Sequence, residues 1–275
     1  MLLSTNRCFH LSLFTLTRLL PTAYNRPNAS MSAITMQQLT EQLVSWIREY
    51  IRAANARGAV VGISGGIDSS VVSVLCKHAF PNSTLGLIMP CHSISTDAEH
   101  AYAVANKFQI PTRLIDLGNT FDALLRVLPG QESDPVTRKA AEANIKPRLR
   151  MTTLYYFAAR LHYLVAGSGN KCELEIGYFT KHGDGGVDIL PIGNLVKSQV
   201  CSLAEHLGIP RQIIDKPPSA GLWEGQTDEQ EMGLTYEQLD LYCTTGQADE
   251  AVRGKIEGRI ALNKHKRAMP PIPSF

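Results

Sequence analysis

The segment from Gly62 to Ser70 reads Gly-Ile-Ser-Gly-Gly-Ile-Asp-Ser-Ser and combines flexible, hydroxyl-bearing and acidic residues. It begins at the end of the short apolar run 59–63 and leads into the helical pattern of 67–79. The loop is therefore expected where a strand gives way to a helix, which is where open α/β sheets bind ligands. Glycines let the backbone turn tightly with N–H groups aimed inward, and the helix N-terminus adds about half a positive charge. These features predict a cradle for an anion.

Two well-known phosphate loops do not match this segment. A Walker loop requires a lysine followed by serine or threonine, and the segment contains no lysine. The dinucleotide fingerprint G-x-G-x-x-G is also absent. A Gly-Gly turn after a strand can be purely structural. The Asp68-Ser69-Ser70 that follows favours a ligand, because an acidic residue beside a phosphate cradle implies a bridging cation.

Short apolar runs alternate with helical patterns along the chain and define the elements that must position this loop. The alternation predicts βαβ units, hence a parallel sheet covered on both faces. We expect an α/β fold, a doubly wound parallel sheet with additional C-terminal helices, in a single domain spanning residues 31–275. The expected strands are 59–63, 85–89 and 113–117, and the expected helices are 36–56, 67–79, 96–108, 120–128, a long pattern over 135–165, 197–207, 236–243 and 248–262.

Charge and cysteine content exclude several classes of protein. Lys plus Arg total 27 and Asp plus Glu total 25, a formal net charge of +2, so the chain as a whole is not drawn to nucleic acid or anionic lipid. We expect no nucleic-acid and no membrane partner. None of the 6 cysteines forms a C-x-x-C pair, which argues against a zinc knuckle or a thioredoxin-type site. Reduced thiols in a reducing compartment, the cytoplasm, are expected.

The first thirty residues differ from the rest of the chain. The apolar stretch 11–20 is interrupted by Arg18 and is too short to span a bilayer. No acidic residue precedes Glu41, whereas several arginines do. Residues 1–30 are expected to be an extension outside the fold, either a transit-like segment, a disordered extension or the product of an upstream start codon.

The segment Ser-Gly-Gly-Ile-Asp-Ser-Ser at 64–70 resembles the PP-loop of the ATP pyrophosphatases. These enzymes cleave ATP between its α- and β-phosphates, and the loop holds the departing pyrophosphate while an acyl group is adenylated. The loop does not by itself distinguish NAD, GMP and asparagine synthetases from tRNA-thiolating relatives. Three downstream segments, 144–151, 167–189 and 216–233, resemble the NAD synthetase family, and the likeness runs from about residue 40 to the C-terminus.

The resemblance implies a role for each matching residue. It implies Mg²⁺ as the cofactor, held by Asp68 and Glu173, and catalytic roles for Asp68 and Lys197. The residues implied in ATP binding are Gly62, Ile63, Ser64, Gly65, Gly66, Ile67, Asp68, Ser69, Ser168, Lys197 and Ser219. Those implied in binding deamido-NAD are Arg148, Lys181, Asp188, His265 and Lys266.

The reaction implied by the resemblance is a ligation in two steps. Deamido-NAD reacts with ATP to give an adenylate and pyrophosphate, and ammonia then gives NAD and AMP, the last step of NAD biosynthesis. Asp184, in the Gly-rich segment 182–186, is our hypothesis for the group that accepts the proton from ammonia. We expect ammonia to be used directly, because 275 residues leave no room for an amidase domain. The resemblance also implies a homodimer.

Two further functions stay open on the sequence. Another PP-loop adenylating enzyme, such as a tRNA-modifying one, is expected to show a catalytic cysteine pair or a basic RNA-binding stripe, and neither is visible in the sequence. A nucleotide-binding sensor without turnover would bind ATP but would not convert it to AMP.

Overall fold

The computed structural model describes residues 34–128, 134–219, 221, 223 and 225–274. The predictions for residues 1–30 lie outside the described residues. The segment Thr35–Phe275 forms one compact unit.

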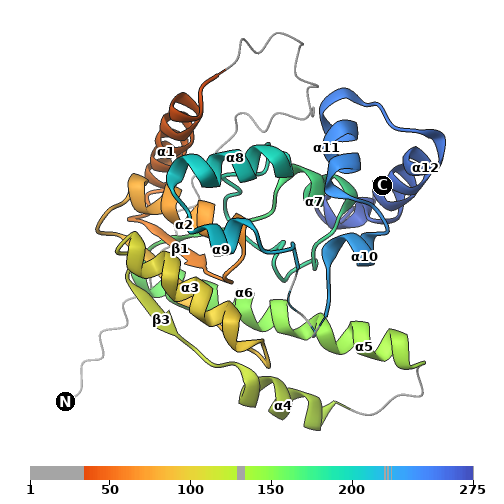
Figure 1. Cartoon of the computed structure of the whole chain (residues 1–275). Helices are drawn as coiled ribbons and strands as arrows, with labels where there is room; N and C mark the ends of the chain where they lie inside the picture. The colour runs from red at the N-terminus through yellow and green to blue at the C-terminus, as the bar shows by residue number, and fades with distance from the viewer. Residues whose placement is uncertain (1–33, 129–133, 220, 222, 224, 275) are drawn as a thin grey trace. The chain divides into compact units, whose positions relative to one another are not determined.

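A parallel four-stranded sheet forms the centre of this unit (Figure 1). Its strands are β1 (Ala59–Gly62), β2 (Thr84–Ile88), β3 (Thr112–Leu114) and β4 (Leu164–Ala166), in the order β3-β2-β1-β4. The chain moves outward from β1 to β3 through α2 (Ile67–Ala79) and α3 (Ser95–Lys107), then returns to place β4 on the other side of β1. This reversal beside β1 is the doubly wound topology, so the predicted fold class is confirmed.

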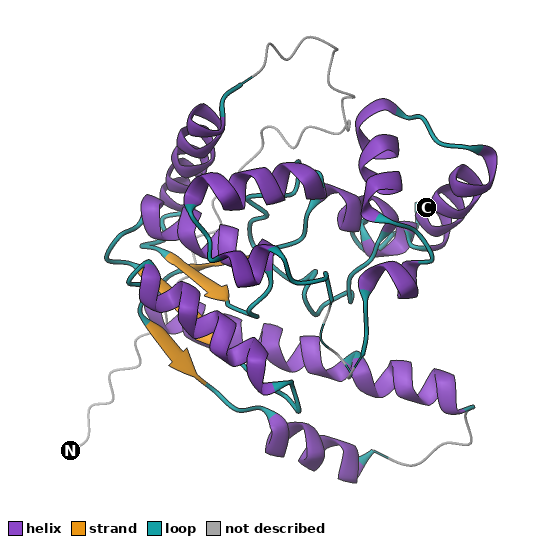
Figure 2. Ribbon diagram, viewed as in Figure 1, coloured by secondary structure: helices purple, strands orange, loops and turns teal. Residues whose placement is uncertain are grey.

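Helices cover both faces of the sheet (Figure 2). Alternate residues of the inner strand β1 point to opposite faces and are therefore buried under different helices. Ala59 and Val61 belong to a core shared with α1 (Met36–Ala53), α2 and α8 (Lys197–Leu207). Val60 belongs to a separate cluster with Ala158 of α6 (Ile145–Leu161). Burial on both faces explains why the strand is a continuous apolar run without polar alternation.

The C-terminal part contributes a second, smaller core. Its helices are α7 (Lys171–Ile176), α9 (Arg211–Ile214), α10 (Asp228–Met232), α11 (Tyr236–Thr245), α12 (Glu250–Leu262) and the 3₁₀ turn η1 (Lys264–Lys266). Ile176, Met232, Leu239 and Ile256 are buried together with Val196, which precedes α8. Figure 1 shows α7, α10, α11 and α12 grouped beside the sheet. The predicted additional C-terminal helices are confirmed. The smaller core connects α7, α10, α11 and α12 to Val196 at the start of α8, whereas Ile213 of α9 is buried in the main core.

One long predicted helix is divided in the structure, and one short predicted helix is present. The helical pattern predicted over 135–165 is divided into α5 (Pro135–Ala143) and α6, after which the chain enters β4. At the break, Asn144 Nδ2 donates to the carbonyl of Ala140, and Asn144 Oδ1 accepts from Thr180 Oγ1 at 2.6 Å. Such side-chain bonds to the backbone compete with a continuous helix. The helix predicted near 120–128 is present as α4 (Gly118–Val127).

No helix in the described part of the chain is long and apolar enough to cross a membrane. Cys76, Cys91, Cys172, Cys201 and Cys243 are all present as free thiols.

Candidate functional site

The predicted anion loop lies at the carboxyl end of β1, directly before α2. Gly65 has a φ of +81°, and a Cβ built on it would lie 2.3 Å from the carbonyl oxygen of Asp97 in α3. Both facts require glycine at this position, since a left-handed backbone and a backbone contact exclude a side chain. The Gly65 turn therefore packs against α3 while the following backbone leads into the N-terminus of α2.

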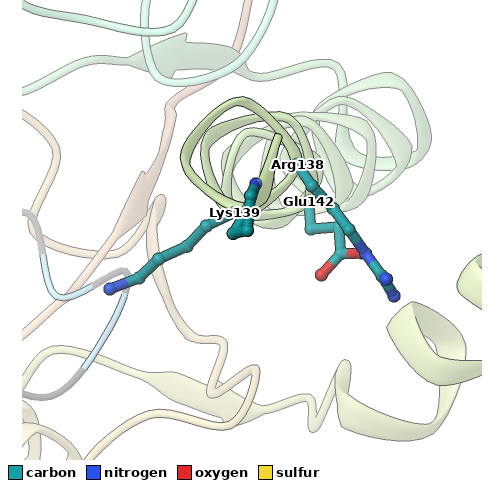
Figure 3. Close-up of a pocket in the computed structure, with 4 residues that line it drawn as sticks. Arg138, Lys139 and Glu142 are labelled. Atoms are coloured by element: carbon teal, nitrogen blue, oxygen red, sulfur yellow. The ribbon is translucent and has the colours of Figure 1, made fainter. Parts of the chain in front are cut away.

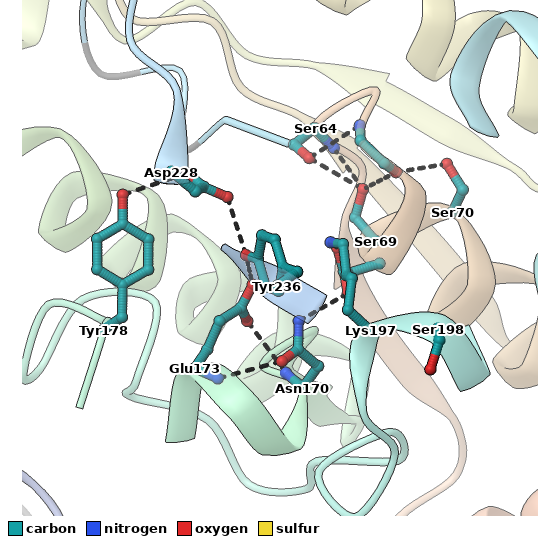
Figure 4. A network of polar contacts seen from close by, with 12 residues as sticks. Ser64, Ser69, Ser70, Asn170, Glu173, Tyr178, Lys197, Ser198, Asp228 and Tyr236 are labelled. Carbon is teal, nitrogen blue, oxygen red and sulfur yellow. Dashed lines mark hydrogen bonds and ion pairs between the residues drawn. The ribbon is translucent and has the colours of Figure 1, made fainter. Parts of the chain in front are cut away.

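Serine hydroxyl groups shape the inside of this loop (Figure 4). Ser64 Oγ and Ser69 Oγ share a hydrogen bond at 2.9 Å, and Ser64 N donates to Ser69 Oγ at 3.2 Å. Ser70 Oγ donates to the carbonyl of Gly66 at 2.7 Å. The first N–H groups of an α-helix have no intrahelical acceptor. The start of α2 thus presents N–H groups and hydroxyls suited to phosphate oxygens.

Asp68, in the first turn of α2, forms an ion pair with Lys197 at the start of α8. Only 7% of the Lys197 side chain and 17% of the Asp68 side chain are exposed. Asn170 Nδ2 donates to the other carboxylate oxygen, Asp68 Oδ1, at 3.1 Å. The structure therefore brings together two predicted site residues that are 129 positions apart in the sequence.

Glu173 of α7 lies next to this pair in a network that also contains tyrosine (Figure 4). Tyr236 Oη lies within hydrogen-bond distance of Glu173 Oε1 and of Asp228 Oδ2, at 3.1 Å from each. The Lys197 ammonium lies 4.8 Å from the centroid of the Tyr236 ring. Asn170 N donates to Glu173 Oε2 at 3.0 Å, which forms the N-terminal capping box of α7.

Burial and like charge disturb the titration of this network. Burial, followed by the charge of Asp68, raises the pKa of Glu173 to about 8. Burial alone lowers the pKa of Lys197, but Asp68 and Glu173 outweigh it and raise that pKa above its ordinary value. Lys197 is therefore charged at neutral pH, whereas Glu173 without a bound cation is largely protonated.

The carboxylates of this network fit Mg²⁺ when ATP supplies the remaining ligands. The carboxyl groups of Asp68, Glu173 and Asp228 all lie near the ammonium of Lys197, so acidic groups outnumber the cation there. In the part of the chain that the structure describes, no cluster of three or more His, Cys, Asp or Glu could hold a metal alone. Mg²⁺ is commonly bound by one or two carboxylates together with substrate phosphates. Asp68 and Glu173 match that arrangement.

The residues predicted to bind deamido-NAD form a second group, on α6, the 177–186 segment and η1. Lys181 Nζ donates to the carbonyl of His265 at 2.7 Å, and Arg148 Nη2 donates to the carbonyl of Lys181 at 3.4 Å. Lys266 Nζ donates to the carbonyls of Gly177 and Phe179, at 2.8 and 2.9 Å. The basic segment at the C-terminus is thus anchored to the 177–186 segment, and four of the five predicted residues lie together.

Asp188, the fifth residue of that prediction, is bonded within the fold. Its Oδ1 accepts from Tyr155 Oη at 2.9 Å, and its Oδ2 accepts from Val165 N at 2.8 Å. The neighbouring Ile189 forms an isolated parallel bridge with Ala166, so residues 187–190 lie beside β4 without forming a strand. In this structure Asp188 fixes the junction of α6 and β4.

Asp184, the hypothetical proton acceptor, lies on the turn formed by residues 181–185. Its Oδ1 accepts from Thr180 N at 2.9 Å. Desolvation of its carboxyl group raises its pKa, and the charge of Lys266 lowers it by less. The geometry therefore places Asp184 with the second group of residues, beside Lys266, and not with the Asp68–Lys197 pair.

The two serines predicted to bind ATP outside the loop lie on separate segments. Ser168 lies between two glycines immediately after β4, and β4 is the parallel neighbour of β1. Its backbone is therefore at the same edge of the sheet as the anion loop. Ser219 Oγ accepts from Gly221 N at 3.1 Å in the segment before α10.

A shallow hollow of about 300 Å³ on α5 is separate from these residues (Figure 3). It is lined by Pro135, Arg138, Lys139 and Glu142. Lys139 extends away from the other two labelled side chains in Figure 3, and its ammonium lies 4.7 Å from the Trp223 ring centroid. None of the predicted site residues lines this hollow.

Sequence reasoning assigned no role to Asn170, Asp228 or Tyr236. Asn170 and Asp228 are within segments that carry the family resemblance, and the Asn170-x-x-Glu173 spacing is a capping-box signature. Tyr236 gave no signal beyond its place at the start of a predicted helix. Only the packing of α11 against α7 brings its hydroxyl to Glu173.

Comparison with known proteins identifies a family and similar relatives. The family model described as NAD synthase matches residues 39–270, a range that contains every predicted site residue. A protein of Carboxydothermus hydrogenoformans named NH(3)-dependent NAD(+) synthetase is 51% identical over 240 residues, covering 87% of this chain and 98% of that protein.

Two solved structures have a fold similar to that of this chain. NMN synthetase from Francisella tularensis matches with a TM-score of 0.82 and 35% identity, over 88% of this chain and 100% of that chain. NH3-dependent NAD synthetase from Campylobacter jejuni matches with a TM-score of 0.72 and 28% identity, over 88% of this chain and 100% of that chain.

The Gly65 turn yields a prediction about stability. Gly65→Ala places a Cβ on a left-handed backbone and against the carbonyl of Asp97, so we expect a loss of about 1–3 kcal/mol in the free energy of unfolding. Gly66→Ala is the matched control, because its Cβ would meet only Ser64 Oγ at 3.4 Å. Urea denaturation of both variants without ligand checks this. Equal stabilities of the two variants would contradict the prediction.

The titration of Glu173 yields a second prediction, for metal-free protein. Its pKa in the folded state is about 8, against an ordinary value of 4.5, so between these values the folded protein holds a proton that the unfolded chain has released. Stability therefore falls as the pH rises through this window. From pH 6 to pH 8, we expect Glu173→Gln to gain about 2 kcal/mol in unfolding free energy relative to the unchanged protein.

The measurement is urea denaturation in EDTA at several pH values. Glu237→Gln, an exposed substitution of the same kind on α11, is the control and should follow the unchanged protein. Parallel pH profiles for Glu173→Gln and the unchanged protein would show that Glu173 does not hold a proton in this range.

Proposed function

The chain belongs to the NAD synthase family, and we propose that it is an AMP-forming ligase that converts deamido-NAD, ATP and ammonia to NAD, AMP and pyrophosphate. The observation that carries the proposal is the buried Lys197–Asp68 pair beside the glycine loop at the carboxyl end of β1. This arrangement suits cleavage of ATP between its α- and β-phosphates. The NH3-dependent relative, 51% identical, supports ammonia as the nitrogen source.

The first step activates a carboxylate that is otherwise a poor acylating group. The nicotinate carboxylate attacks the α-phosphorus, a mixed anhydride with AMP forms, and the bond to pyrophosphate breaks. In this proposal the N–H groups at the start of α2 and the hydroxyls of Ser64 and Ser69 hold the departing pyrophosphate. Lys197 is charged and buried, so it can neutralise phosphate oxygens where negative charge grows.

Mg²⁺ is part of this proposal, with Asp68 and Glu173 as its protein ligands. When bound, it supplies positive charge to the phosphates during displacement at phosphorus. Its charge would favour the carboxylate form of Glu173, which burial otherwise disfavours. The carboxylate excess beside Lys197 supports the assignment.

The second step is attack of ammonia on the acyl carbon, which releases AMP and forms the amide. Arg148, Lys181 and Lys266 gather cationic groups near Asp184, and such groups suit the pyrophosphate and carboxylate of a dinucleotide. We assign Asp184 as the acceptor of the proton that ammonia loses. Desolvation raises the pKa of Asp184, which makes its carboxylate a stronger base than an ordinary aspartate and supports this assignment.

A second candidate acceptor follows from the comparison of structures. The Francisella tularensis structure, with its TM-score of 0.82, is named an NMN synthetase, which by its name forms a mononucleotide. The corresponding substrate would be deamido-NMN, which lacks the adenylate half of deamido-NAD. The higher identity to an NAD synthetase favours the dinucleotide.

A tRNA-modifying enzyme and a nucleotide sensor receive less support. The NAD synthase match over 39–270 favours this family over a tRNA-modifying PP-loop enzyme. The intact set of Asp68, Glu173 and Lys197 favours an active enzyme over a sensor. The free thiols in the described part of the chain support a reducing compartment such as the cytoplasm.

A homodimer is also part of the proposal, with α6 as the contacting element. Tyr156 on α6 is 55% exposed, although aromatic side chains are usually covered. Near the C-terminal end of α6, Phe157, Leu161 and Tyr163 help to line a surface hollow of about 450 Å³. An exposed aromatic face of this kind suits a second copy of the chain.

The activity is tested with the full chain, ATP, Mg²⁺ and either deamido-NAD or deamido-NMN, with ammonium or glutamine as nitrogen donor. We expect equal amounts of NAD, AMP and pyrophosphate from deamido-NAD with ammonium only. If an amide product forms from deamido-NMN and not from deamido-NAD, the acceptor substrate is the mononucleotide and not the dinucleotide. AMP without an amide product would leave the acceptor unknown, and the absence of AMP in every reaction would favour a sensor.

The role of Asp184 is tested by Asp184→Asn. Because the amide cannot take a proton, we expect turnover at limiting ammonium to fall by about 10²-fold or more, with its pH dependence altered. Asp249→Asn provides the comparison and should keep its turnover, since Asp249 caps α12, a helix that carries none of the predicted site residues. Unchanged turnover across pH in Asp184→Asn would remove Asp184 from the mechanism.

The dimer is tested by light scattering of the unchanged protein and of Tyr156→Lys. We expect twice the chain mass for the unchanged protein. We expect a large shift toward monomer for Tyr156→Lys, because the lysine would lie beside Arg160, which contacts Tyr156, and burying two like charges is costly. Tyr50→Lys, on the exposed face of α1, is the control. A monomeric unchanged protein would contradict the proposal.

A further inference from the structure

The N-terminus of α8 is capped by a side chain from a distant helix. Val196 occupies the N-cap position and cannot accept a hydrogen bond through its side chain. Instead, Lys197 N donates to Asp240 Oδ1 at 3.0 Å and Ser198 N donates to Asp240 Oδ2 at 2.8 Å. Asp240 belongs to α11, so it performs the task that Ser, Thr, Asp or Asn normally performs from the N-cap itself.

The same carboxylate also contacts α7. Cys172 Sγ donates to Asp240 Oδ1 at 3.1 Å, and Cys172 is fully buried. Cys172 precedes Glu173, and Lys197 is the first residue of α8. Asp240 is thus bonded directly to the two helices that carry the proposed Mg²⁺ ligand and the phosphate-binding lysine.

Tyr236 lies one helical turn before Asp240 on α11, so the two side chains share a face of that helix. Tyr236 contacts the side chains of Glu173 and Lys197, while Asp240 contacts the backbone that carries Lys197. One face of α11 therefore contacts both the side chains of Glu173 and Lys197 and the backbone at the start of α8.

Charge gives the cap a second effect. A lysine at the first helical position lies near the positive end of the helix dipole, which disfavours its ammonium group. A carboxylate at the same N-terminus is favourable and offsets this repulsion. Asp240 therefore supports a cationic residue at a helix terminus where negative charge is normally favoured.

We propose that Asp240 is a positioning residue for the adenylation step, which holds the start of α8 so that Lys197 meets the phosphates of ATP. This inference rests on the proposed function. It requires that loss of Asp240 slow the adenylation step more than it weakens binding of the acceptor, because Arg148 and Lys181 lie on other elements.

The experiment compares Asp240→Ala, Asp240→Asn and Asp249→Ala in the full chain. Asp249 is the matched control, since it accepts from Val252 N at 2.8 Å and caps α12, a helix that carries none of the predicted site residues. Adenylation is isolated by the exchange of labelled pyrophosphate into ATP, dependent on deamido-NAD. Thermal unfolding of each variant is measured in parallel.

We expect Asp240→Ala to lower the maximal exchange rate about tenfold or more, with the KM for deamido-NAD within about twofold, because small misplacements of a positioned group are costly. Asp249→Ala should show a similar loss of melting temperature with an unchanged exchange rate. Asp240→Asn retains one acceptor oxygen in place of two and should fall between Asp240→Ala and the unchanged protein.

An exchange rate within twofold of the unchanged protein in folded Asp240→Ala would overturn the inference. If Asp240→Ala does not fold, Asp240→Asn decides: a threefold or larger loss of exchange rate supports the inference, and an unchanged rate overturns it. Failure of the proposed function is distinguishable, because the unchanged protein would then show no exchange with deamido-NAD.

Discussion

The ion pair between Asp68 and Lys197 is the interaction on which the candidate site depends. Both side chains are largely buried, and removing one partner of such a pair typically costs about 3–5 kcal/mol because a charge is left unpaired in a low dielectric. Replacing both by apolar residues often costs little. Stability alone therefore does not explain the pair, which keeps an ammonium group beside the glycine loop.

The sheet topology makes this pair possible. Because β1 and β4 are parallel neighbours, the loop after β1 and the segment after β4 emerge at the same edge. The loop leads into α2 with Asp68, and the segment leads into α7 with Glu173. α8 packs against α2 in the main core, while Val196, which precedes it, is buried in the smaller core with Ile176 of α7. Two apolar cores thus hold the three helices that carry the charged groups.

An excess of carboxylates gives the network an unequal charge balance. Asp68, Glu173 and Asp228 all influence Lys197, and burial raises the pKa of Glu173 to about 8. Either a proton or a metal ion can neutralise the buried carboxylate of Glu173. A proton would not neutralise the negative charge of bound phosphates, whereas Mg²⁺ would do so and would keep Glu173 ionised. The same carboxyl group thus affects the stability of the metal-free protein and, in the proposed function, the binding of Mg²⁺ with ATP.

Local patterning along the chain was enough to predict the alternation of strands and helices and the position of the glycine loop. These features depend on short-range periodicity and on the conformational freedom of residues such as Gly65. The family resemblance then assigned roles to Asp68, Glu173 and Lys197, because ordered motifs carry that information without geometry. The division of α5 from α6 was missed, because it depends on a contact between Asn144 and Thr180.

Long-range packing, in contrast, determines how the charged residues are held. The cap on α8 comes from Asp240, 43 residues later, and the hydroxyl on Glu173 comes from Tyr236, 63 residues later. No periodicity or spacing connects such partners, because they meet only when α11 packs against α7 and α8. The raised pKa of Glu173 has the same origin, since desolvation is a property of the folded surroundings and not of the residue.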